Sequence, residues 1–128
     1  MRKVEPLGRR FFWVKKTGNI VAQRQEMAEG IESTKEEDFE VYIELKGYDP
    51  DAIEMTTFAP GQYAEDFRQA KSWRFDPETG QIVFSYYSDP NDPAPEQPKY
   101  QRPLTEQIEE LKQAVAELTM LMTATPTT

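Results

Sequence analysis

The sequence predicts an α+β protein: a small, β-hairpin-rich N-terminal domain with one helix, then a proline-rich linker and a C-terminal coiled-coil-like helix. Three observations lead to this prediction: β-prone runs that flank turn residues, prolines clustered after residue 88, and a heptad repeat near the C-terminus. We expect the domain at 1–88, an acidic linker at 89–103, an oligomerising helix at 104–122 and a frayed tail at 123–128. The 128 residues fit one domain with an appendage, because domains commonly have about 100–150 residues.

Two β-prone runs within residues 11–25 surround Thr17, Gly18 and Asn19. Glycine and asparagine tolerate the positive φ that a tight turn requires. This segment therefore predicts a β-hairpin.

A helix is expected to begin near Thr34, because Thr34 precedes Glu37 by three residues, the spacing of a capping box. Phe39, Tyr42 and Ile43 follow with helical spacing and predict the buried face of the helix. The glycine that ends this run is a natural C-terminal stop.

The second half of the domain predicts further strands. Residues 53–58 are β-prone, and residues 63–70 have the composition of a short helix. Further on, aromatic-rich runs flank the turn sequence DPETG. We expect residues 72–76 and 81–87 to pair as two strands.

Five of the ten prolines lie between Ser88 and Pro103, and this density favours an extended spacer over a strand or helix. Such a spacer would let each domain reach its own docking site.

The C-terminal segment carries an apolar seam with alternating spacings of four and three residues, which is the heptad pattern. Because an isolated helix of this length is marginal in water, the seam needs a partner. Self-association is favoured, and another protein or the N-terminal domain are the alternatives. Isoleucine and valine in one row with leucine in the other suit a dimer, but Ala114 and Leu121 widen the face and favour a homotrimer. The predicted oligomerisation residues are Leu104, Ile108, Leu111, Val115, Leu118 and Met122.

The composition argues against catalysis and against several classes of partner. The chain has no cysteine and no histidine, which removes disulfides, thiolate and imidazole chemistry, and Cys/His metal sites. A net charge of -8 opposes binding to nucleic acid or anionic membrane, and no segment approaches the ~20 apolar residues of a membrane span. We expect no enzymatic activity, no metal or other cofactor, and protein partners. The adjacent acids Glu65 and Asp66 are interpreted as a solvated face.

Most of the aromatic side chains are interpreted as core, because the domain is poor in aliphatic residues. An exposed aromatic face would instead suit a partner. The candidate docking residues are Phe12, Trp13, Trp73 and Tyr87.

The order of three segments resembles that of small proteins encoded in tail modules of phages and defective prophages of Gram-positive bacteria, near the tail-fibre genes. The segments are EEDFEVYIELK (36–46), GQYAEDFRQA (61–70) and WRFDPETGQIVFSYYSDP (73–90), followed by the proline linker and the heptad helix. The resemblance implies a virion structural or tail-accessory role and carries over no catalytic residues.

Together these features predict a structural component of a phage tail, at the tail tip, the baseplate or the fibre attachment, in contact with other tail proteins. It would be found in the host cytoplasm before assembly and in the virion tail afterwards. Two other hypotheses stay open. One is a host-surface saccharide-binding module, and the other is a tail assembly chaperone that is absent from the finished particle.

Overall fold

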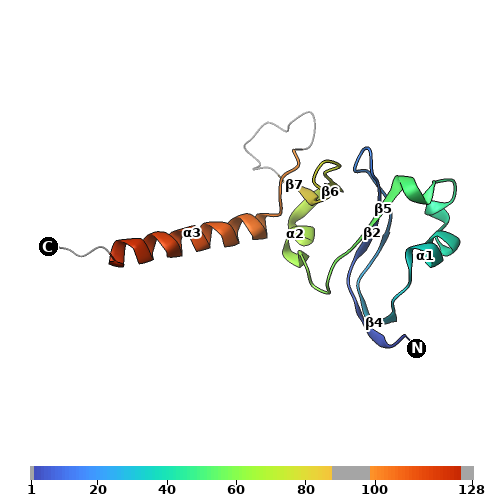
Figure 1. Cartoon of the computed structure of the whole chain (residues 1–128), viewed down its shortest axis with the longest axis horizontal. Coiled ribbons are helices and arrows are strands. Elements are labelled where there is room, and N and C mark those ends of the chain that lie inside the picture. Colours follow the sequence, from blue (N-terminus) through green and yellow to red (C-terminus); the bar gives the residue numbers. More distant parts are fainter. Residues whose placement is uncertain (1, 88–98, 125–128) are drawn as a thin grey trace.

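The computed structural model describes residues 2–87 and 99–124. Within these residues the chain is a mixed α and β protein, as predicted. Seven strands form three small antiparallel sheets, and the long helix α3 (Leu104–Ala124) follows them. Figure 1 shows the strands and short helices gathered in one body, from which α3 extends to one side.

The middle sheet has the order β3-β2-β5, with β2 (Arg10–Val14) between β3 (Ile20–Arg24) and β5 (Ile53–Thr57). β2 and β3 form the predicted hairpin, and Gly18 in its turn has a φ of +80°. β5 confirms the strand expected at 53–58 and pairs antiparallel with β2. The aromatic run of the sequence therefore forms the central strand of the sheet.

Side chains alternate along β2, so its aromatic residues are divided between the two faces of the sheet. Phe12 lies on one face and packs with Leu45 and Ile53 in a small buried cluster. The helix α1 (Lys35–Val41) and the 3-10 helix η1 (Ile43–Leu45) follow in sequence, and η1 supplies Leu45 to this cluster.

The capping box that the sequence predicts is confirmed at the start of α1. The Thr34 backbone N–H donates to the Glu37 carboxylate at 3.0 Å, and the Glu37 N–H donates to the Thr34 hydroxyl at 3.2 Å. The helix ends earlier than expected, because the backbone of Tyr42 is extended. The expectation for Ile43 is therefore wrong: its side chain is exposed, and Leu45 fills the core position instead.

The other face of the middle sheet carries Phe11 and Trp13. It is covered by the short helix α2 (Ala64–Gln69) and the strand pair β6 (Ala70–Phe75) and β7 (Ile82–Tyr86), all expected from the sequence. This second cluster is the larger one. Its buried aromatic residues are Phe11, Trp13, Phe67, Phe75 and Phe84.

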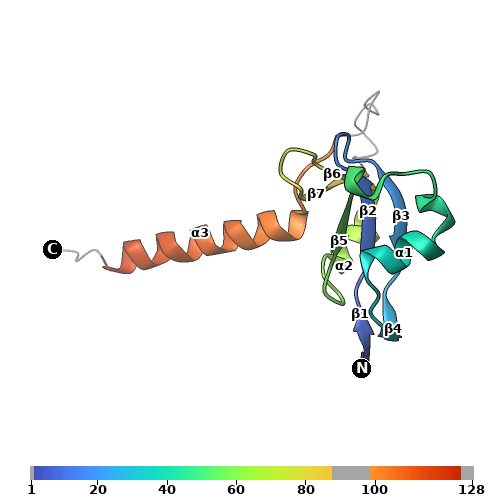
Figure 2. The same cartoon turned by 45° about the vertical axis from the view of Figure 1, so that its right-hand side comes forward.

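One pair of strands was not predicted. β1 (Val4–Leu7) and β4 (Met27–Ile31) form a two-stranded antiparallel ribbon, which Figure 2 shows at the lower end of the domain. The strands are short, and β1 contains Pro6, which an edge strand accommodates because its outer side needs no N–H donor. The guanidinium of Arg24 on β3 contacts Glu32, directly after β4, and so ties the ribbon to the middle sheet.

The predicted spacer at 89–103 falls mostly on residues 88–98, which lie outside the described residues. Its last residues contact the domain. Gln101 exchanges two backbone hydrogen bonds with Phe84, at 2.8 and 2.9 Å, and Pro103 is buried. The prediction of a spacer that continues to residue 103 is therefore wrong, because this end of the segment pairs with the edge of β7.

Candidate functional site

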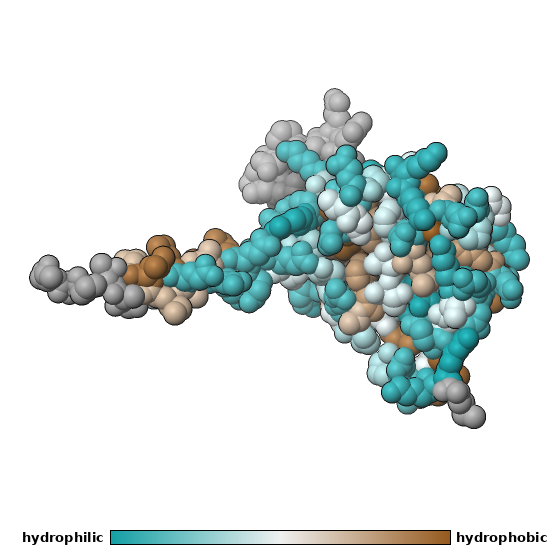
Figure 3. All heavy atoms as spheres, in the orientation of Figure 1, coloured by the Kyte–Doolittle hydropathy of each residue, from teal (hydrophilic) through white to brown (hydrophobic). Residues whose placement is uncertain are grey.

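The helix α3 presents an apolar stripe to solvent. Figures 1 and 2 show α3 leaving the domain as one straight helix, and Figure 3 shows apolar side chains gathered on its outer half. Leu111, Val115 and Leu118 are 65%, 56% and 58% exposed. Exposed apolar patches on proteins are commonly interaction sites, because leaving apolar surface in water is costly, so the stripe is the candidate functional site.

The predicted oligomerisation residues lie along this stripe. Leu104, at the domain end, is partly buried, whereas the five from Ile108 to Met122 are exposed. Among the described residues these five side chains do not pack on the N-terminal domain, which gives no support to the alternative in which the helix folds back. The helix continues two residues beyond its predicted end, and residues 125–128 of the predicted frayed tail lie outside the described residues.

The heptad positions that flank the seam carry no acidic residue. Lys112 and Thr119 flank it on one side and Gln107 and Ala114 on the other. All four glutamates of α3 fall on the remaining positions: Glu106, Glu109, Glu110 and Glu117. Two helices that pair through the seam would therefore not bring their glutamates together.

The first turn of α3 is fixed to the domain by hydrogen bonds. The carboxylate of Asp66, on α2, accepts from the backbone N–H of Thr105 at 3.2 Å and also from the Thr105 hydroxyl. The hydroxyl of Tyr86, on β7, accepts from the N–H of Leu104 at 3.0 Å and donates to Asp66 at 2.7 Å. We call these four residues, Asp66, Tyr86, Leu104 and Thr105, the helix junction.

A second contact lies beside the helix junction, where the Tyr63 hydroxyl donates to the Glu106 carboxylate. Burial, together with this hydrogen bond, raises the pKa of Tyr63 to about 12. Burial and the hydrogen bond to Asp66 likewise raise the pKa of Tyr86 above its ordinary value. Both phenols therefore remain neutral donors at physiological pH.

Sequence reasoning missed the helix junction. Glu65 is exposed as expected, but Asp66 is only 2% exposed, so its interpretation as a solvated acid is wrong. The two neighbours cannot be told apart without the position of α3. The one available signal is that Pro103, directly before the helix, has no side chain that could cap it.

Two of the four candidate docking residues are core residues. Phe12 and Trp13 are 0% and 4% exposed, because both faces of their strand are covered, and the Trp13 indole N–H donates to Thr56 at 3.0 Å. Docking through these two side chains is therefore excluded. Tyr87 is 72% exposed and Trp73 is partly buried, so a docking role for either stays a prediction.

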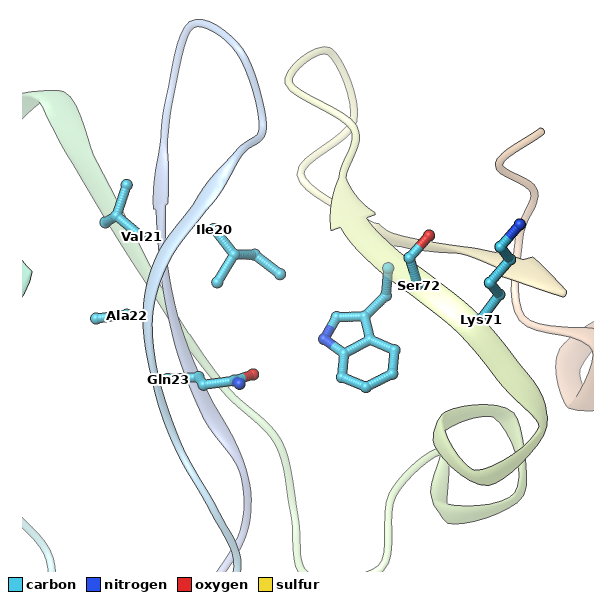
Figure 4. Close-up of a pocket in the computed structure, with 7 residues that line it drawn as sticks. Ile20, Val21, Ala22, Gln23, Lys71 and Ser72 are labelled. Carbon is cyan, nitrogen blue, oxygen red and sulfur yellow. The ribbon is translucent and has the colours of Figure 1, made fainter. Parts of the chain in front are cut away.

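Trp73 lines a shallow groove of about 360 Å³ between β3 and β6. Figure 4 shows residues of β3 on one side of this groove and Lys71 and Ser72 of β6 on the other. The structure gives no hydrogen bond or ion pair to the side chains of Gln23 and Lys71 within the described residues. The groove therefore combines an aromatic ring with a free amide and a free ammonium group.

Within residues 2–87 and 99–124, no three acidic side chains gather in a way that could hold a metal ion, and no helix is long and apolar enough to cross a membrane. No protein-family model, curated protein or solved structure matches the chain.

Proposed function

We propose that this protein is a non-enzymatic structural component of a bacteriophage tail, and that it assembles with copies of itself through α3. The observation that carries the proposal is the exposed stripe from Ile108 to Met122. Burying one leucine side chain contributes about 1.5–3 kcal/mol, so association offers this helix stability that it lacks alone. The breadth of the stripe favours a homotrimer over a dimer.

The location in a tail rests on the resemblance of residues 36–46, 61–70 and 73–90 to tail-module proteins. It agrees with an acidic chain that has neither cysteine nor histidine, because a structural role requires no reactive side chain. The tail tip, the baseplate and the fibre attachment are the positions proposed. Other tail proteins would contact the domain, which α3 leaves exposed on several sides.

Mass spectrometry of purified tails tests this function. We expect the protein at a fixed stoichiometry that is a multiple of the α3 oligomer, before and after a high-salt wash. Its absence from finished tails, together with its presence in assembly intermediates, would favour the chaperone hypothesis instead.

The groove beside Trp73 favours a second candidate, a saccharide-binding module, because sugars stack on aromatic rings and accept hydrogen bonds from amide and ammonium groups. A shift of tryptophan fluorescence with wall oligosaccharides, lost in Trp73→Ala and kept in Tyr87→Ala, would support it. An unchanged fluorescence spectrum would argue against saccharide binding at this groove and leave the structural function as the proposal.

A further inference from the structure

We infer that Asp66 is a positioning residue for assembly: the domain caps α3 through Asp66 and thereby fixes the direction in which the helix leaves each copy. The inference deepens the proposed function and rests on it for its biological purpose. The geometry of the helix junction carries the argument.

The first N–H groups of an α-helix have no partner inside the helix, and a side chain directly before the helix usually accepts from them. In α3 this preceding residue is Pro103, whose ring offers no acceptor. The domain supplies the acceptors instead, since Tyr86 accepts from Leu104 and Asp66 accepts from Thr105. The cap of α3 therefore belongs to residues that are 18 and 39 positions away in sequence.

The carboxylate of Asp66 depends on α3 in turn. It is almost fully buried, and no cation pairs with it among the described residues. In the described part of the chain, its side chain accepts hydrogen bonds from the Tyr86 hydroxyl and from the N–H and hydroxyl groups of Thr105. A buried charge without its donors is costly, so swinging α3 away would destabilise the domain as well as the helix.

The contacts around the helix junction restrain the helix from several sides. Tyr63 holds Glu106, and the buried Pro103 follows the backbone pair of Gln101 and Phe84. A helix on a simple tether would have none of these restraints. Each copy therefore presents its stripe at one fixed angle to its domain. In an oligomer, every domain is then held at the same angle to its own helix.

Distances between two spin labels test the inference directly. The chain has no cysteine, so Glu54→Cys on β5 and Gln113→Cys on α3, both at exposed positions, create unique labelling sites. Pulsed dipolar spectroscopy is measured on doubly labelled protein diluted in unlabelled protein, so that only distances within one chain contribute. We expect one narrow distance distribution for the otherwise unchanged chain.

Four substitutions give the contrast. Asp66→Ala is expected to broaden the distribution severalfold. Thr105→Val, which keeps the backbone N–H bond to Asp66, and Asp66→Asn, which keeps an acceptor oxygen, should each broaden it less. Glu65→Ala removes the exposed neighbouring acid and should leave the distribution narrow. A broad distribution in the unchanged chain, or variants as narrow as it, would overturn the inference.

Two controls keep the outcome unambiguous. Near-ultraviolet circular dichroism reports whether the aromatic core of each variant is intact. Thr105→Val changes α3 rather than the core, so this variant tests the inference if Asp66→Ala does not fold. Sedimentation of the same samples reports self-association separately. A monomer with a narrow distribution would defeat the proposed assembly and leave the capping by Asp66 standing.

Discussion

The guanidinium of Arg10 lies 2.8 Å from the carboxylate of Asp38, and both side chains are nearly fully buried. Arg10 belongs to the central strand β2 and Asp38 to α1, so this ion pair joins the middle sheet to the helix that follows it. Arg10 also donates to the hydroxyl of Thr57 at 2.8 Å and the carbonyl of Ser33 at 2.9 Å. The pair is therefore the centre of a buried polar network between β2 and α1.

Removing one partner of this pair should be destabilising. Asp38→Ala leaves the buried guanidinium of Arg10 with Glu32, at 2.8 Å, as its remaining carboxylate partner and takes one acceptor away. We expect a loss of about 1–3 kcal/mol in the free energy of unfolding, the cost of a buried donor left unsatisfied. Urea denaturation followed by tryptophan fluorescence measures this. The matched control is Glu36→Ala in the same helical turn, whose side chain is exposed. Equal effects of the two substitutions would show that the buried pair contributes nothing specific.

The stability of the ribbon should depend on pH through Glu32. The hydrogen bond from Arg24 holds the pKa of Glu32 below its ordinary value. Because the folded-state pKa is the lower one, its contribution is complete above the unfolded value of about 4.3 and is lost as the pH falls through the folded value.

The test compares the chain with Glu32→Gln in urea at neutral pH and at acidic pH. The difference in free energy of unfolding between them should shrink on acidification. Glu29→Gln, at an exposed position on β4, is the control and should change stability little at either pH. A difference that grows on acidification would contradict the sign derived for Glu32.

Alanine substitutions at two turn glycines distinguish the cost of backbone strain from the cost of a steric overlap. Both Gly18 and Gly80 have positive φ, +80° and +74°, so alanine at either costs about 1–2 kcal/mol. A Cβ at Gly18 would also overlap the carbonyl oxygen of Phe75, whereas a Cβ at Gly80 meets no atom. Thermal denaturation should therefore show Gly18→Ala as clearly the less stable variant. Equal melting temperatures would mean that β6 does not hold this contact with the hairpin.

The parts of the fold that the sequence predicted are those with local causes. The capping box needs only Thr34 and Glu37, and the two hairpins need only a turn flanked by β-prone runs. The ribbon was missed because its strands are short and contain Pro6 and Gly30, residue types that are depleted in strands, and because its anchor, Arg24 with Glu32, is a tertiary contact.

The same distinction holds for the candidate site. The heptad spacing predicted the stripe of α3, because helical periodicity is visible in one segment. The helix junction joins Asp66 to Thr105 across 39 positions, and no local pattern indicates such a pair. Likewise, the sequence could not separate the buried Trp13 from the exposed Tyr87, because burial depends on which face another element covers.

The measurement that tests self-association most directly is sedimentation equilibrium over a concentration series, with two matched variants of α3. Leu111→Gln with Leu118→Gln removes the centre of the stripe, and Glu109→Gln with Glu117→Gln changes positions away from it. We predict an oligomer, with a mass near three times 14.9 kDa, for the unchanged chain and the glutamate variant, and a folded monomer of 14.9 kDa for the leucine variant. A monomer for the unchanged chain at every concentration would contradict self-association and assign the stripe to a different protein.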